Sequence, residues 1–73
     1  MFALSAKVNR GGAICTEYFQ PEEKGIVNGV VFGMLDGKKR AKHYETEEEA
    51  IRDIPAFRGV VGHNDLHVDV VPV

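Results

Sequence analysis

Residues 2–9, FALSAKVN, alternate between apolar and polar or small side chains, and two glycines follow shortly after them. Period-two alternation of this kind is typical of a β-strand with one buried face. Residues 10–12, Arg-Gly-Gly, separate it from a second such run, AICTEYF, at 13–19. A glycine pair between two strand-like runs predicts a β-hairpin. The chain is therefore expected to begin with two antiparallel strands.

The length of the hairpin turn decides which side of the second strand is buried. A two-residue turn at Gly11 and Gly12 places Glu17 opposite Ala6 on the core face. A three-residue turn that includes Arg10 moves Glu17 to the outer face. Because a buried carboxylate without a partner costs several kcal/mol, the sequence favours the three-residue turn.

A second hairpin is predicted at Asp36-Gly37, the dipeptide most typical of a type I′ turn. A two-residue loop there pairs residues 30–35 with residues 38–43, and paired residues share a face. The predicted core face consists of Val30, Phe32, Met34, Ala41 and His43. The predicted outer face carries Val31, Leu35, Lys38, Arg40, Lys42 and Tyr44.

One helix is expected after this hairpin. Thr46 and Glu49 have the spacing of a capping box, in which each side chain satisfies a backbone donor at the helix start. Ala50, Ile51 and Ile54 form a short apolar stripe. Pro55 predicts that the helix ends near residue 53 or 54, which leaves residues 58–62 as a connector or short strand.

Histidines and aspartates alternate along the last predicted strand, whose dry face is Leu66, Val68 and Val70. His63, Asp65 and His67 would share the other face, and two imidazoles with a carboxylate suit Zn²⁺ or a similar ion. Neighbours on one strand face are about 6.5–7 Å apart, so two ligands converge there more readily than three. The sequence favours the simpler interpretation, an exposed polar strand face.

These segments predict one small α+β domain that spans residues 1–73. Its core would be a mostly antiparallel sheet of four to five strands, built from two hairpins, then a helix, then a C-terminal strand. The single helix would pack on one face of the sheet.

Composition narrows the classes of function. The chain has 73 residues, 44% of them hydrophobic, a net charge of −2 and a single cysteine. These values are ordinary for a folded protein and exclude an internal disulfide. The N-terminal residues do not have the pattern of a secretory signal, and no apolar run approaches the roughly 20 residues of a membrane helix. We expect a soluble, cytoplasmic protein without a cofactor.

The function expected from these features is non-catalytic binding to another protein. One short helix covers only one face of the predicted sheet, and the sequence contains no catalytic motif. The predicted partner-binding residues are Val31, Leu35, Lys38, Arg40, Lys42 and Tyr44. The small size and layout resemble those of inhibitors that phages and mobile elements use to mask a surface of a host enzyme or defence complex.

Other functions remain open at this point. The basic residues of 38–44, the second arm of the predicted hairpin, would suit a nucleic acid, although 9 basic and 11 acidic side chains nearly balance. A metal site through His63, Asp65 and His67 is the third candidate. Homodimerisation is expected either through a sheet edge or through the uncovered sheet face.

One local resemblance is present. The segment HYETEEEAIRDI, residues 43–54, resembles the start of the helix in some bacterial antitoxin domains. It amounts to a capping box, because the Pro-Asp-Leu-Pro-Gly loop of those domains and the cysteine after it are missing. The resemblance implies a small α+β protein and transfers no functional residue.

Overall fold

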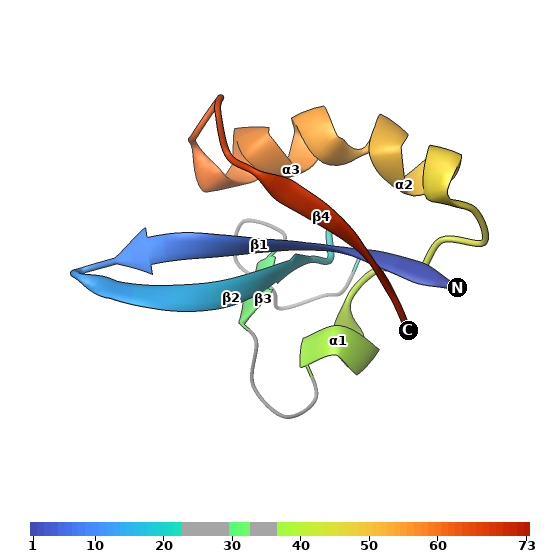
Figure 1. Cartoon of the computed structure of the whole chain (residues 1–73), viewed down its shortest axis with the longest axis horizontal. Helices are drawn as coiled ribbons and strands as arrows, with labels where there is room; N and C mark the ends of the chain where they lie inside the picture. Colours follow the sequence, from blue (N-terminus) through green and yellow to red (C-terminus); the bar gives the residue numbers. More distant parts are fainter. Residues whose placement is uncertain (23–29, 33–36) are drawn as a thin grey trace.

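The structure is a computed structural model that describes residues 1–22, 30–32 and 37–73, with only the backbone of residues 30–32. Its described strands form an antiparallel sheet in the order β3-β2-β1-β4. The strands are β1 (Phe2–Arg10), β2 (Ala13–Phe19), β3 (Val30–Phe32) and β4 (Val68–Pro72). The helices are α1 (Gly37–Arg40), α2 (Glu47–Arg52) and α3 (Ile54–Val61). Figure 1 shows α2 and α3 together on one side of the sheet and α1 on the other.

The predicted α+β class with an antiparallel sheet is therefore confirmed, but the sheet is less extensive than predicted. Among the described residues, only β1, β2 and β4 have five or more residues, and β3 adds three residues beside β2. The missing strand is the second arm of the predicted hairpin at Asp36-Gly37.

The first hairpin forms where it was predicted, but with the shorter turn. Ala6 lies opposite Glu17, and Arg10 opposite Ala13, so only Gly11 and Gly12 lie between the strands. Both glycines have positive φ, +63° and +91°, as a type I′ turn requires. The prediction of a three-residue turn is wrong, and Glu17 faces the core.

The buried Glu17 carboxylate has a partner that the prediction did not consider. Arg10 Nε donates to Glu17 Oε2 at 2.7 Å, and Arg10 Nη2 donates to Oε1 at 2.9 Å. Arg10 lies on the same sheet face as Ala6, because strand residues alternate in direction. The two-residue turn therefore supplies the bidentate cation that a buried carboxylate needs.

The prediction of the second hairpin is wrong for the described part of its second arm, because residues 37–40 form helix α1 and not a strand. Residues 42–44 instead fill the gap where β1 and β2 separate. The Lys42 N–H donates to the Phe19 carbonyl at 2.9 Å, and Tyr44 and Phe2 exchange two backbone hydrogen bonds of 2.7 and 2.8 Å. These bonds satisfy backbone groups of Phe2 and Phe19 at the end of the first hairpin, where β1 and β2 no longer pair with each other.

The predicted core face of that hairpin is confirmed at one described position. Ala41 is buried, whereas His43 is exposed. Met34 lies outside the described residues, and Val30 and Phe32 lie in β3, for which only the backbone is described.

The helix starts as predicted and extends further than predicted. The Thr46 hydroxyl accepts a hydrogen bond from the Glu49 N–H at 3.2 Å, which is one half of the capping box. α2 ends at Arg52 with Asp53 as its C-cap, near the predicted end, but the prediction of a connector or short strand at residues 58–62 is wrong. After Asp53, α3 runs through Val61, so α2 and α3 form one bent helix (Figure 1). Pro55 is tolerated because it lies in the first turn of α3, where its missing N–H has no helical acceptor to lose.

The core lies between the bent helix and the sheet. Phe57 of α3 is fully buried, and its ring stacks on Phe19 with 5.3 Å between the ring centroids. The predicted dry face of β4 is confirmed, because Leu66 is buried and Val68 and Val70 pack against the same cluster. The buried cluster consists of Leu4, Ala6, Val8, Phe19, Tyr44, Ala50, Phe57 and Leu66.

Candidate functional site

Two regions of the described structure gather polar or exposed side chains. One is a polar network under the bend between α2 and α3. The other is the sheet face opposite the bent helix.

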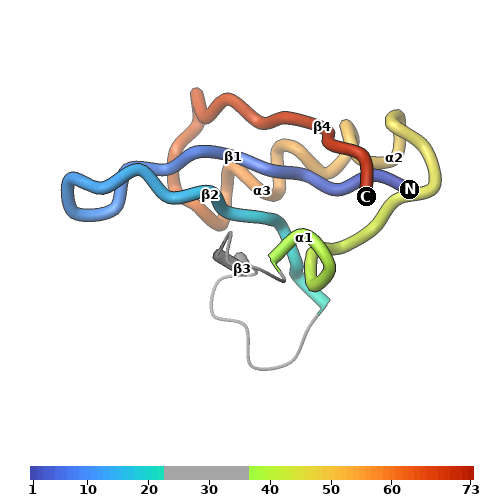
Figure 2. The backbone as a smooth tube through the Cα atoms, turned by 60° about the horizontal axis from the view of Figure 1, so that its bottom comes forward, coloured from blue at the N-terminus to red at the C-terminus, as the bar shows by residue number. Residues whose placement is uncertain are grey.

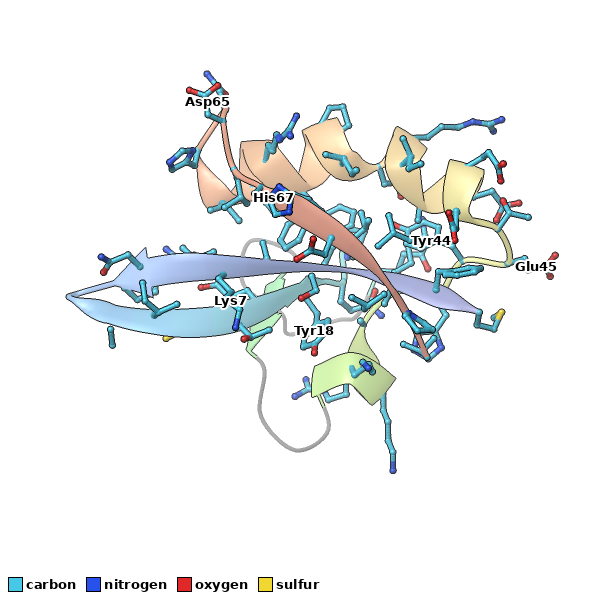
Figure 3. All side chains as sticks on the ribbon, viewed as in Figure 1. Lys7, Tyr18, Tyr44, Glu45, Asp65 and His67 are labelled. Carbon is cyan, nitrogen blue, oxygen red and sulfur yellow. The ribbon has the colours of Figure 1, made fainter. Side chains whose placement is uncertain are left out.

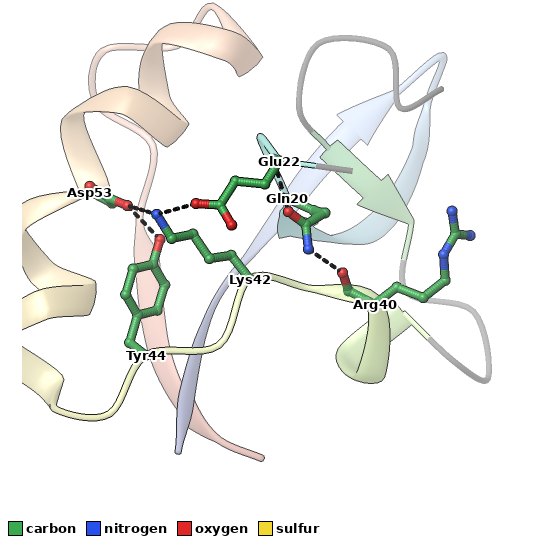
Figure 4. Close-up of polar contacts among 6 residues, drawn as sticks. All are labelled: Gln20, Glu22, Arg40, Lys42, Tyr44 and Asp53. Carbon is green, nitrogen blue, oxygen red and sulfur yellow. Dashed lines mark hydrogen bonds and ion pairs between the residues drawn. The ribbon is translucent and has the colours of Figure 1, made fainter. Parts of the chain in front are cut away.

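The polar network links the segment after α1 to the bent helix (Figure 4). The Tyr44 hydroxyl donates to Asp53 Oδ2 at 2.7 Å. Lys42 Nζ lies 3.4 Å from the same oxygen and 3.1 Å from Glu22 Oε1. The Lys42 ammonium also lies 5.3 Å from the centroid of the Tyr44 ring. Asp53 thus accepts from two donors at the point where α2 ends and α3 begins.

Tyr44 and Lys42 both keep their protons at neutral pH. Burial raises the pKa of the Tyr44 hydroxyl far above its usual range, and the hydrogen bond to Asp53 raises it further. The hydrogen bond to Glu22 raises the pKa of Lys42; burial of the ammonium opposes that effect, and Asp53 adds to it. A tyrosine and a lysine with raised pKa values are poor bases and poor nucleophiles. This chemistry favours a structural role for the network.

A pocket of about 290 Å³ opens beside the network. Its lining combines cationic and anionic side chains, and it is open to solvent. The lining residues are Lys42, His43, Tyr44, Glu49, Arg52 and Asp53. Because Asp53, Lys42 and Tyr44 already bond to one another, a ligand would have to compete with these internal bonds.

The second region is the sheet face that α2 and α3 leave uncovered. We call it the open sheet face and define it by outward-facing residues of β1, β2 and β4. The pairings Lys7 with Thr16, Ser5 with Tyr18 and Ala3 with Val71 place these strands in register on it. Figure 2 views the sheet with the bent helix behind it, and Figure 3 shows Lys7 and Tyr18 directed away from that helix. Its residues are Lys7, Ile14, Thr16, Tyr18, Asp69 and Val71.

The open sheet face is partly apolar. Ile14 is 65% exposed, and it is among the most exposed large hydrophobic side chains of the described residues. Tyr18 and Val71 are half-buried, and the residues opposite them on the same face, Ser5 and Ala3, are buried. Lys7 and Asp69 add one charge of each sign. An aromatic and aliphatic centre with scattered charges is typical of protein-binding surfaces.

Four of the predicted partner-binding residues have described side chains, and these four lie in two different places. Lys38 and Arg40 are exposed on α1, whereas Lys42 and Tyr44 belong to the polar network. The Val31 backbone pairs with Tyr18, which places residue 31 in register with the open sheet face. Leu35 lies outside the described residues.

The predicted metal ligands His63, Asp65 and His67 all lie in the segment between α3 and β4. His63 and Asp65 lie in the turn after α3, because β4 begins only at Val68. The Asp65 N–H donates to His63 Nδ1 at 3.2 Å, while the His67 ring bonds to Asp69 at 2.9 Å. Within residues 1–22, 30–32 and 37–73, no three His, Cys, Asp or Glu side chains gather closely enough to hold a metal ion.

Sequence reasoning missed Glu17 with Arg10, and it also missed Asp53 and Glu22 as partners of Lys42 and Tyr44. A signal for Arg10 was present, because the glycine pair alone defines a type I′ turn and thereby places Arg10 and Glu17 on one face. No local pattern links Tyr44 to Asp53, since their contact depends on how the bent helix docks on the sheet.

Comparisons with known proteins give no relative to reason from. No protein-family model matches the chain, and searches of curated proteins and of solved structures find no similar protein. Among the described residues, no helix has the length and apolar character that crossing a membrane requires.

Proposed function

We propose that this protein is a small non-catalytic binding module that contacts a protein partner through its open sheet face. The observation that carries the proposal is the exposure of Ile14 on the same sheet face as the half-buried Tyr18, a face that the bent helix does not cover. Burying apolar surface of this kind stabilises a complex by about 25 cal/mol per Å² before the costs of association. Masking a surface of a host enzyme or defence complex, as phage-type inhibitors do, is the form of binding that suits so small a domain.

The polar network supports the proposal from the other side of the molecule. Its tyrosine and lysine stay protonated, and its carboxylate is occupied by both of them. Such a network fixes the bend of the helix and leaves no activated group for catalysis. In this proposal Lys42 and Tyr44 therefore stabilise the fold, while Lys38 and Arg40 flank the binding face from α1.

A matched pair of variants tests the proposal. Ile14→Glu places a charge on the open sheet face near the hairpin turn, and Ile51→Glu places one on α2, where Ile51 is 51% exposed. Wild type and both variants are immobilised and exposed to lysate of the native host, and the retained proteins are identified by mass spectrometry. We expect a protein that wild type and Ile51→Glu retain and Ile14→Glu loses.

The control makes this result specific. Both substitutions replace an exposed isoleucine by a glutamate, so charge, solubility and non-specific adsorption change alike. A partner that both variants retain equally would refute binding through the open sheet face. So would a partner that only Ile51→Glu loses.

Nucleic-acid binding is a second candidate because exposed cations lie close to the aromatic residue of the same face. Lys38 and Lys39 are exposed on α1, which packs against β2, the strand that carries Tyr18. Lys7 extends from the neighbouring strand β1. Cations beside an aromatic ring suit the phosphates and bases of a single strand.

Salt dependence separates this candidate from protein binding. Binding to a fluorescent single-stranded oligonucleotide would weaken steeply with salt. Replacing Lys38 and Lys39 by serine would reduce the slope of log affinity against log salt concentration by about two, because two phosphates would no longer be neutralised by a lysine. The absence of binding at low salt would eliminate the candidate.

A further inference from the structure

β4 is an outer strand of the described sheet. Its hydrogen bonds show which of its backbone groups point toward β1 and which point outward. The order β3-β2-β1-β4 leaves β4 paired with β1 alone among the described residues. The Val73 N–H donates to the Met1 carbonyl at 3.0 Å, so residue 73 bonds toward β1. Because bonding alternates along an antiparallel strand, Val71 and Asp69 also bond toward β1. The backbone groups of Val68, Val70 and Pro72 therefore point to the outer edge.

Two other contacts agree with this assignment of inward and outward backbone groups. Phe2 of β1 exchanges hydrogen bonds with Tyr44, on the side of β1 away from β4. The Arg10–Ala13 pair closes a two-residue turn, a position at which the flanking pair is hydrogen-bonded. Even-numbered residues of β1 thus bond away from β4, and odd-numbered residues bond toward it. β4 then presents the N–H and C=O of Val68 and Val70 and the C=O of Pro72 at its outer edge.

The composition of β4 suits pairing at this edge. Proline is tolerated in edge strands where its missing N–H faces outward, and Pro72 meets that condition. Lysines commonly guard edge strands against addition of another strand, and β4, with the sequence VDVVP, has none. Its only charged side chain, Asp69, already bonds to His67.

We propose that β4 pairs with β4 of a second copy of this chain, antiparallel and about a two-fold axis at Val70. In this register each Val70 exchanges two backbone hydrogen bonds with Val70 of the other copy. Each Val68 N–H donates to the Pro72 carbonyl of the other copy. Pro72 therefore contributes only the acceptor that it has, and every outward group of Val70 is satisfied.

The register with the two-fold axis at Asp69 is less favourable for two reasons. It places Asp69 directly opposite Asp69 of the other copy, and like charges at opposed positions repel. It also needs the Leu66 N–H, which already donates to the His63 carbonyl at 3.2 Å. In the proposed register Asp69 lies opposite Val71, and Leu66 is not used. The strand is thus more self-complementary about Val70 than about Asp69, which is why we assign a second copy as its partner.

Pairing in this way would join two sheets edge to edge, with both open sheet faces on the same side. The dimer would then offer two copies of the proposed binding face to one partner or to a symmetric one. This consequence depends on the proposed function, whereas the dimer does not. Loss of partner binding with an intact dimer would refute the binding face alone.

Light scattering on wild type and two variants tests the dimer. Val70→Pro removes an outward N–H that has no acceptor among the described residues, and Ile14→Ser changes the open sheet face without touching the edge. At high protein concentration we expect twice the chain mass of 8.1 kDa for wild type and Ile14→Ser, and a single mass for Val70→Pro. A monomeric wild type, a dimeric Val70→Pro, or dissociation by Ile14→Ser would each overturn the proposal.

Amide hydrogen exchange on the wild-type chain gives the same test without a variant that could unfold. We expect the Val68 and Val70 amides to become more protected as protein concentration rises. The Asp69 and Val71 amides, which bond toward β1, should stay protected at every concentration. Rapid exchange of Val68 and Val70 at the highest concentration would overturn the pairing.

Discussion

Replacing Phe57 by alanine should remove much of the stability of this domain. The Phe57 ring is fully buried, and it stacks on Phe19 at 5.3 Å between centroids. Truncation of a buried phenylalanine to alanine costs about 3–5 kcal/mol, from lost burial and from the cavity left behind. A 73-residue domain at about 0.05–0.15 kcal/mol per residue has a total free energy of unfolding of about 4–11 kcal/mol. The substitution should therefore remove between about a quarter and all of it.

Urea unfolding followed by circular dichroism measures this loss. With a slope near 1 kcal/mol per M, the midpoint should fall by about 3 M or more. Val60→Ala is the matched control, because Val60 lies on the same helix and is 36% exposed. Its midpoint should change by no more than about 0.5 M. Equal shifts for the two variants would mean that α3 does not continue past Pro55 into the core, and the described helix would be refuted.

Three further predictions test the contacts that organise the fold. Thr46→Ala should lower the free energy of unfolding by about 1 kcal/mol through loss of the cap, and an unchanged urea midpoint would contradict this. Folding raises the pKa of Tyr44, mainly by burial, so stability should fall as pH rises above about 10, where the unfolded tyrosine begins to lose its proton. The fall should be steeper in wild type than in Tyr44→Phe, and equal slopes in unfolding measured from pH 8 to pH 11 would count against it. Arg10→Gln should destabilise the hairpin because it leaves the Glu17 carboxylate buried without its bidentate partner, and adding Glu17→Gln should restore part of the loss in thermal melts.

The sequence predicted those elements that are determined by residues close together in the chain. Alternation predicted β1 and β2, the glycine pair predicted the position of their turn but not its length, and the Thr46–Glu49 spacing predicted the start of α2. The dry face of β4 also followed from alternation alone. In each case the residues that determine the structure are close in sequence.

The errors have a common physical origin in contacts between distant residues. Glu17 is buried because Arg10 reaches it across the hairpin, and the sequence rule that carboxylates avoid the core did not include that partner. The predicted second arm of the hairpin at residues 38–43 is absent, since residues 37–40 form α1 and residues 42–44 bond to β1 and β2 where these strands separate. The chain remains helical after Pro55 because a new helix, α3, begins after Asp53 and Pro55 lies in its first turn.

The candidate site could be predicted only as a class of surface. The sequence predicted a single helix on one side of the sheet; α2 and α3 do lie together on one side, but α1 lies on the other. The sequence could not name the residues, because Lys42 and Tyr44 had been assigned to a strand that does not form. The open sheet face follows instead from the register of β1, β2 and β4.

The central claim, that a partner binds the open sheet face, is tested most directly by nuclear magnetic resonance. Uniformly ¹⁵N-labelled protein would be titrated with the partner recovered in the capture experiment, and amide shift changes would be mapped residue by residue. We predict that the largest changes cluster at Lys7, Ile14, Thr16 and Tyr18, with small changes along the bent helix. Changes concentrated on α2 and α3 would contradict the claim.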